Sequence, residues 1–416
     1  MARKQEGGGR IAPRGLVNEY AGGVRERRGM TPEARRVLIL SITCVLLVFA
    51  GMLLPTKMFG SGAMTEFTFT VFLDNVTANF NGLVGVFTGN GASFESRFMV
   101  VLCCAVSGAA LGLCGSAYQG AFNNPLAAPK TLGVMSGGAL GALIFVVFLQ
   151  DVGPQFPFSG SYSEAQVQAW LATLNPLERF WMDYGECICS VIGCFVVVGI
   201  VMFITGVLGK GRMSNVIVII FGQVFASTVT AIISFARYYY TAMGNAGIDM
   251  VDQLREIENY TMVLAYDFDD LYIIVLPLVV CMAIVLAMRR RLTLLSFGDD
   301  EASTMGIDVN RTRYAMIAVC TLMTGIAISF CGHVAFLGFI SAHLARRIVG
   351  PDFRYLLPAS LCTGAGLLTV IQWVCQSGLP GTSAYAAGTV CSVVGACLFL
   401  VIVLAQRGKG GSGDWR

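Results

Sequence analysis

The chain has 416 residues, of which 55% are apolar and only 13% are charged, and its mean hydropathy is +0.70. A soluble domain usually carries about 25% charged residues, so this composition excludes an ordinary soluble protein. The net charge of +3 does not indicate nucleic-acid binding, because the basic residues lie beside apolar runs without interleaved aromatics.

Apolar runs dominate the chain after a polar start. Residues 1–36 are rich in glycine and basic, with nine Lys/Arg and four Glu, and we expect a disordered cytoplasmic tail. Ten runs follow, most of them long enough to cross a hydrocarbon core of about 30 Å. We therefore predict an all-α polytopic membrane protein, with a transmembrane domain over 37–405 and a second cytoplasmic tail over 406–416. The predicted spans are Val37–Leu54, Phe98–Ala117, Thr131–Leu149, Gly185–Val207, Asn215–Tyr238, Leu271–Met288, Tyr314–Phe330, Val334–Ile348, Leu356–Cys375 and Ala386–Ala405.

The distribution of charge predicts the orientation of these spans. If both termini are cytoplasmic, the inner segments hold 23 of the 28 Lys/Arg, and the outer segments hold five. Cytoplasmic loops of membrane proteins carry an excess of Lys and Arg. The expected location is a bacterial plasma membrane, with both termini inside.

One cytoplasmic segment, Arg289–Val309, is the most charged interior stretch of the chain. We predict a short helix in it, with Asp299 as the N-cap, two further acids at the positive N-terminus, and Gly306 at C′ with Ile307 as its apolar contact. About six residues of helix are marginal alone in water. The segment is therefore either a docking element for a soluble partner or a solvated loop.

A second candidate lies at the cytoplasmic turn between the second and third spans. The segment Gln119–Ala142, QGAFNNPLAAPKTLGVMSGGALGA, contains two asparagines and two prolines that interrupt a helix. Broken backbone at membrane depth is tolerated where it lines a cavity or is shielded by protein. The alternative is a tight turn between two helices, and the residues alone do not separate the two.

Groups that could carry chemistry are scarce within the spans. There is no relay of acids and histidines of the kind that a proton-coupled carrier needs, no GxxxxGK[ST] motif, and no catalytic set. His333 and His343 lie near opposite ends of spans, and no metal site is expected. Most of the 14 cysteines lie in apolar runs as small fillers, while a bridge among Cys187, Cys189, Cys331 and Cys375 near the outer edge stays open.

Two blocks of sequence resemble the FecCD family of ABC-importer permeases, which carry iron–siderophore complexes, haem and vitamin B12. Gln119–Ala142 is similar to the family pattern QGxxRNPLAxPxxLGVxSGA. Gly298–Val309 resembles GEExAxSLGV, and Gly332–Asp352, GHVAFLGFISAHLARRIVGPD, resembles GPIGFVGLxxPHIARxxVGPDHR. The order of the spans extends the similarity over about 37–405. The chain departs from the family at Asn123, Ala128, Ala342 and Gly395-Ala396-Cys397.

The resemblance implies a type II ABC-importer permease that dimerises around a central pathway, either with itself or with a paralogue. It implies no cofactor on this chain, ATP on a partner ATPase, and an extracellular or periplasmic binding protein that delivers an iron chelate or a cobalamin-like cargo. Arg97 and Arg255 are the candidates for contact with the binding protein. The implied cytoplasmic gate comprises Asn123, Asn124, Pro125 and Leu126. The implied ATPase-coupling segment comprises Phe297, Gly298, Asp299, Asp300, Glu301, Ala302, Met305 and Gly306.

Two other classes remain as alternatives to an importer subunit. One is an ion- or proton-coupled secondary carrier that acts without an ATPase, which the absence of carboxylates within the spans disfavours. The other is a membrane enzyme or an assembly scaffold, which the lack of a clustered catalytic set disfavours.

Overall fold

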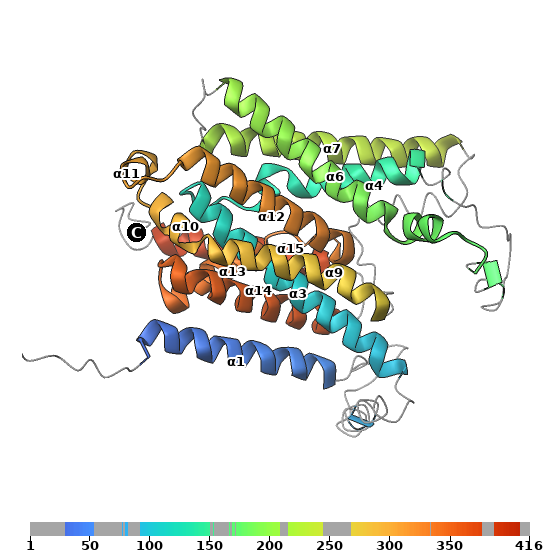
Figure 1. Ribbon diagram of the computed structural model, residues 1–416, viewed down its shortest axis with the longest axis horizontal. Coiled ribbons are helices and arrows are strands. Elements are labelled where there is room, and N and C mark those ends of the chain that lie inside the picture. The colour runs from blue at the N-terminus through green and yellow to red at the C-terminus, as the bar shows by residue number, and fades with distance from the viewer. Residues whose placement is uncertain are drawn as a thin grey trace, which may run out of the picture.

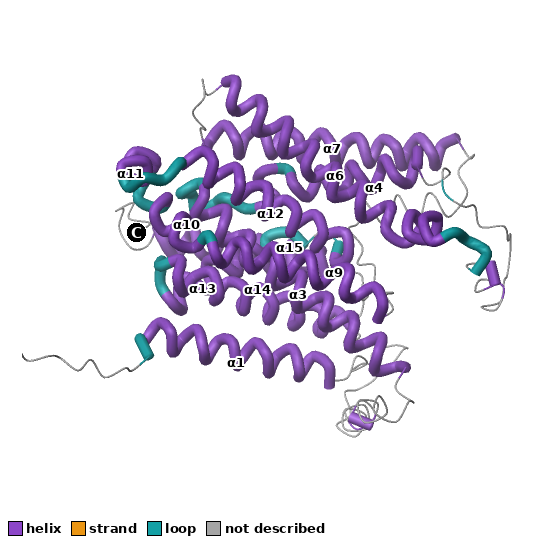
Figure 2. Tube along the Cα trace, viewed as in Figure 1, coloured by secondary structure: helices purple, strands orange, loops and turns teal. Residues whose placement is uncertain are grey.

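A computed structural model of the chain describes residues 30–53, 92–149, 172–208, 215–243, 268–332, 334–376 and 387–407, together with a few single positions between them. Within these ranges the regular structure is entirely helical, and most connections are short (Figure 2). The elements are α1 (Pro32–Leu53), α3 (Ala92–Ala121), η1 (Pro129–Leu132), α4 (Val134–Ile144), η2 (Phe145–Leu149), α6 (Pro176–Leu208), α7 (Asn215–Met243), α9 (Phe268–Ala287), α10 (Arg289–Leu295), α11 (Asp299–Thr304), α12 (Val309–Cys331), α13 (Leu337–Val349), α14 (Phe353–Gln376) and α15 (Ala387–Arg407).

A helix occupies each of the ten predicted spans, and this confirms the all-α membrane fold. Among the described residues, six helices are long and apolar enough to cross a membrane, and two shorter apolar helices cover Val134–Leu149 and Val275–Ala287. The predicted span Thr131–Leu149 is not one regular helix, because it divides into a 3₁₀ turn, an α-helix and a π-helical turn. The helix α10, which directly follows α9, was not predicted from the sequence.

The centre of the bundle is α3, which packs along α14, α12 and α13 (Figure 1). Glycines allow the close approach of α3 and α14, since a Cβ on Gly108 would lie 2.6 Å from the carbonyl oxygen of Gly364. Close packing through small residues is the ordinary way in which membrane helices associate. The helix α1 lies along one side of this core, and α6 with α7 lies along the other.

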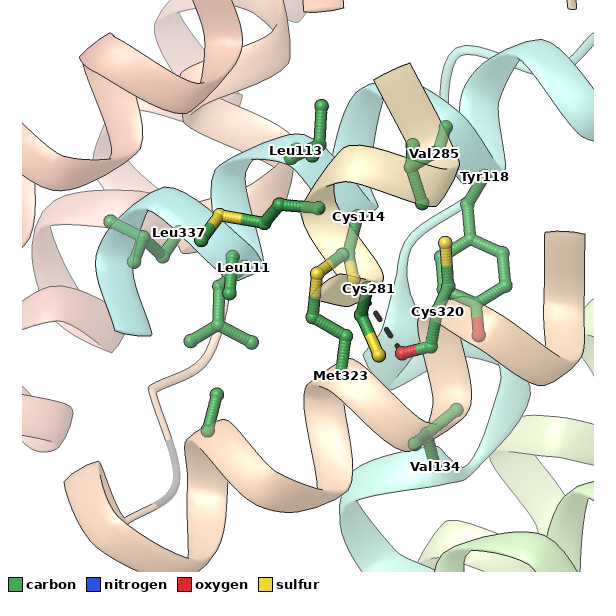
Figure 3. Close-up of a cluster of buried hydrophobic side chains, with 14 of the residues drawn as sticks. Leu111, Leu113, Cys114, Tyr118, Val134, Cys281, Val285, Cys320, Met323 and Leu337 are labelled. Atoms are coloured by element: carbon green, nitrogen blue, oxygen red, sulfur yellow. Dashed lines mark hydrogen bonds between the residues drawn. The ribbon is translucent and has the colours of Figure 1, made fainter. Parts of the chain in front are cut away.

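Sulfur-containing side chains fill part of the core between α3, α9 and α12, as Figure 3 shows around Cys114, Cys281 and Cys320. The thiol of Cys114 donates to the carbonyl oxygen of Cys320, 3.5 Å away. All fourteen cysteines lie in the described ranges and all are free thiols. The bridge that the outer cysteines left open is therefore not formed, and cysteine acts here as a small apolar filler.

Several chain segments that are distant in sequence meet at one end of the bundle. The hydroxyl of Thr31, just before α1, lies 3.0 Å from that of Tyr355 in the first turn of α14. The side chain of Arg36 donates to the carbonyl oxygen of Ile348 near the end of α13. The short helices α10 and α11 lie at this same end (Figure 1). This end carries both of the segments that the sequence singled out.

Candidate functional site

The short helix α11 has well-defined caps. It begins at Asp299, and its N-cap is Gly298 at φ 116°, so the prediction of Asp299 as the N-cap was wrong by one position. The predicted C-terminus is confirmed. Gly306 has φ 82°, its N–H donates to the carbonyl oxygen of Ser303, and the N–H of Ile307 donates to that of Ala302. This pair of bonds forms a Schellman motif, which satisfies carbonyl groups that the helix end would leave unpaired.

The two sides of α11 differ in exposure. Ala302 is fully buried and joins the main core with Leu292 and Leu295 of α10. Phe297 before the helix is 56% exposed and Met305 at its end is 50% exposed. Large exposed apolar side chains thus lie at both ends of α11, and its first turn holds three acidic residues. Two large exposed apolar side chains on a segment anchored to the core make α11 a candidate surface for contact with another protein.

Asp299 does not cap α11 because its carboxylate pairs with Arg313 of α12. The Nη2 of Arg313 lies 2.7 Å from Oδ1 of Asp299, and its Nη1 lies 3.2 Å from Oδ2. The Nε of the same guanidinium donates to the carbonyl oxygen of Ala121, 2.7 Å away, at the end of α3. Arg313 is only 2% exposed, whereas the Asp299 side chain is 54% exposed.

Arg313 is not among the site residues predicted from the sequence, although the sequence contains a signal that it needs an acidic partner. The predicted span began at Tyr314, whereas α12 begins at Val309 because the carboxylate of Asp308 accepts from the backbone N–H of Arg311. Arg313 therefore lies in the second turn of a helix, near its positive end, where a cation is unfavourable unless an anion is close. A basic residue in that place calls for an acidic partner. Asp308 already caps α12, and the next acids along the chain are those of α11, 12 to 14 residues before Arg313.

The predicted gate residues form a compact turn directly after α3. Asn123 has φ 45°, a left-handed conformation that asparagine tolerates better than most residues. The backbone N–H of Asn124 donates to the carbonyl oxygen of Gln119, and its Oδ1 accepts from the N–H of Leu126 at 2.9 Å. The side chain of Leu126 is 46% exposed. The turn is held by its own hydrogen bonds and presents an apolar side chain.

After the gate turn, the backbone runs into the bundle as the 3₁₀ turn η1 and Gly133 before α4 begins. Gly133, at φ 76°, approaches Val197 of α6 and Gly222 of α7, because a Cβ there would lie 3.2 Å from an atom of each. At a rise of 1.5 Å per residue, these contacts lie roughly 10–16 Å inside the ends of α6 and α7 that face α11. Ala127, Pro129 and neighbouring residues are buried. Of the two readings that the sequence left open, the structure favours broken backbone sheltered by protein.

A second polar contact braces the end of α3. The Nη2 of Arg346 in the last turn of α13 donates to Oε1 of Gln119, 3.1 Å away. His343 on the same helix lies against the ring of Phe339 and has its Nδ1 3.1 Å from the Phe339 carbonyl oxygen. The predicted gate turn follows α3 directly, and the predicted coupling helix is joined to the end of α3 through Arg313.

For three other residues named in the sequence analysis, the structure describes the backbone alone or nothing. Arg97 belongs to α3, but its side chain lies outside the described residues. Arg255 and His333 lie entirely outside them.

Comparison with known proteins gives a consistent result. Residues 37–405 match the FecCD transport family. The ferric enterobactin transport system permease protein FepG of Escherichia coli is 28% identical over 379 residues, which are 90% of this chain and 98% of that protein. The cobalamin import system permease protein BtuC of Halobacterium salinarum is 28% identical over 305 residues, or 72% and 69% of the two chains.

A solved structure described as an inward-facing conformation of a metal-chelate type ABC transporter has the same fold. Its TM-score is 0.61 at 21% sequence identity, and the match covers 88% of this chain and 99% of that one.

Proposed function

The chain belongs to the FecCD transport family, and on this premise we propose that it imports a metal chelate or a cobalamin-like cargo, driven by an ATPase that docks on α11. The observation that carries the proposal is the exposed face of α11, where Phe297 and Met305 flank an acidic turn. The chain contains no GxxxxGK[ST] motif, so ATP hydrolysis requires a second subunit.

The end of the bundle that carries α11 is proposed to face the cytoplasm. Exposed arginines surround this end, as the positive-inside rule requires of a cytoplasmic face. They are Arg35, Arg36, Arg289, Arg290, Arg291, Arg311, Arg347 and Arg354. The gate turn from Asn123 to Leu126 then also faces the cytoplasm, where it would control the exit of cargo.

The proposed partners follow from family membership. A second permease copy or a paralogue would complete the central pathway, and an extracellular binding protein would deliver cargo to the opposite end. Arg97 and Arg255 are proposed to contact that binding protein. Relatives named for ferric enterobactin, hemin and cobalamin support a large chelate as cargo. This family membership also favours an importer subunit over a secondary carrier acting alone.

The test places the same charge at opposite ends of the bundle. Met305→Arg puts a cation in the exposed apolar pair, and Leu177→Arg puts one on a side chain that is 78% exposed at the start of α6. Each variant is reconstituted in lipid nanodiscs, and binding of the ABC ATPase that co-purifies with the parent is titrated. Met305→Arg should weaken this binding at least tenfold, and Leu177→Arg should leave it unchanged.

Uptake of ferric siderophore, haemin and cyanocobalamin into vesicles, each with its binding protein, then identifies the cargo class. Uptake that proceeds without any ATPase would establish a secondary carrier and refute the proposal. Equal ATPase affinity of the two arginine variants would remove α11 as the docking site.

A further inference from the structure

We propose that Arg313 is a positioning residue that ties the ATPase-docking helix to the gate turn, so that a displacement of α11 is passed to the end of α3. This inference rests on the proposed function, in which an ATPase docks on α11. Arg313 does not touch the turn itself, and it acts through Asp299 on the docking helix and through the Ala121 carbonyl at the end of α3.

One rigid planar group bridges three helices. The two terminal nitrogens of the guanidinium hold both carboxylate oxygens of Asp299 on α11, and the Nε holds the backbone of α3. Such fork-like pairs add geometric specificity to the charge interaction. Arg313 is 2% exposed, so its bond to the Ala121 carbonyl is shielded from water, whereas the Asp299 side chain at the other end of the bridge is 54% exposed.

The contact on α3 falls where it can affect the gate. The carbonyl oxygen of Ala121 lies at the C-terminal end of α3, where carbonyl groups lack partners within the helix and the helix dipole attracts a cation. Asn123, two residues later, takes the left-handed conformation that turns the chain, and the turn ends at the exposed Leu126. A shift of the Ala121 carbonyl therefore acts directly on the geometry of the turn.

The residue that Arg313 contacts on α11, Asp299, lies close to the proposed docking face. Asp299 is the first residue of the helix and lies two positions from Phe297 on the exposed face, with 54% of its own side chain exposed. The rest of α11 is short and is anchored to the core through Ala302. An ATPase that rotates or tilts α11 must move this carboxylate or break the pair.

The alternative is that the pair only stabilises the local fold. A structural role predicts that loss of Arg313 loosens α11 and weakens ATPase binding. A positioning role predicts that binding persists while the gate turn stops responding to it. These two predictions differ in what is measured, so one experiment separates them.

The experiment reads the gate turn directly. Leu126→Cys provides a probe at the turn, and the exposed Cys397 is changed to Ser in every protein. Parent and Arg313→Gln permeases in nanodiscs are bound to the co-purifying ABC ATPase, and the rate of maleimide labelling at position 126 is measured with and without a non-hydrolysable ATP analogue. Arg311→Gln is the matched control, since it removes the same charge from an exposed position two residues away.

In the parent and in Arg311→Gln, the nucleotide should change the labelling rate at least about fivefold, the lower end of typical coupling between sites. In Arg313→Gln this change should fall below twofold, with ATPase affinity within about threefold of the parent. Asp299→Glu, which keeps a carboxylate, should retain the response, and Asp299→Asn should lose it. If Arg313→Gln does not fold, the labelling response of Asp299→Asn is measured in its place, because this variant removes the other partner of the ion pair.

A labelling response in Arg313→Gln equal to that of the parent overturns the inference. So does a loss of ATPase binding in that variant, because the pair would then only build the docking helix. A parent that binds no ATPase at all refutes the proposed function, and the inference fails with it.

Discussion

Gly306 offers a sensitive test of the docking helix, because its backbone conformation alone sets the cost of a side chain there. The residue has φ 82°, and a Cβ built on it would meet nothing within 4 Å. The Cβ of Gly306→Val therefore meets no neighbour, and the main cost is the strain of the left-handed conformation, about 1–2 kcal/mol for an L-residue. The two hydrogen bonds of the Schellman motif depend on that conformation.

This strain should appear mainly as weaker binding of the ATPase. A helix of six residues has few bonds with which to resist the change, so its last turn should unwind unless docking restores it. If docking must supply about 1–2 kcal/mol, the affinity for the ATPase falls by a factor of about 5–30. The amount of permease inserted in the membrane should stay unchanged, because no membrane-spanning helix is altered.

Titration of the ATPase against permease in nanodiscs measures the effect, and two variants calibrate it. Gly199→Val is the matched control, because a Cβ there also meets nothing within 4 Å and its backbone does not have positive φ. Gly306→Asn should lie between the parent and Gly306→Val, since asparagine tolerates this conformation better than valine. Equal affinities for Gly306→Val and Gly199→Val would refute the reasoning and leave α11 as a solvated turn.

Three further predictions address the packing of α11, the orientation and the opposite end. Ala302→Arg should abolish ATPase co-purification, because this fully buried position has no room for a charged side chain, and co-purification at the parent level would contradict the packing of α11. Engineered cysteines within 155–180 should be labelled from outside intact cells, whereas one at position 300 should not, and labelling at 300 would reverse the orientation. Arg97→Glu should slow association with the binding protein and reduce its salt dependence, because charges at the rim of an interface mainly steer encounter. An unchanged association rate in stopped-flow measurements would remove Arg97 from that contact.

The sequence was sufficient for the features that depend on local pattern. Long apolar runs require membrane helices, because backbone groups in lipid must be paired within the segment. Gly306 was predicted as a helix C-terminus because a left-handed residue is needed there, and the Schellman bonds confirm it. Close helix packing also depends on a local feature, because small residues such as Gly108 on α3 let the backbone approach Gly364 of α14. The motifs around Asn124, Gly306 and His343 together were also enough to identify the family.

Tertiary structure decided the features that depend on which segments meet. The sequence assigned Asp299 to the N-cap because a local carboxylate usually serves the nearest free N–H groups. The folded chain instead brings Arg313 to that carboxylate, and a buried guanidinium needs a counter-charge more than an exposed helix end needs a cap. The break within Thr131–Leu149 is sheltered because α6 and α7 pack against Gly133, and nothing in the local sequence specifies those neighbours. Hydrophobic pattern thus determined where the helices lie along the chain, while the pairing of α3, α11 and α12 through one arginine arose only from their packing in three dimensions.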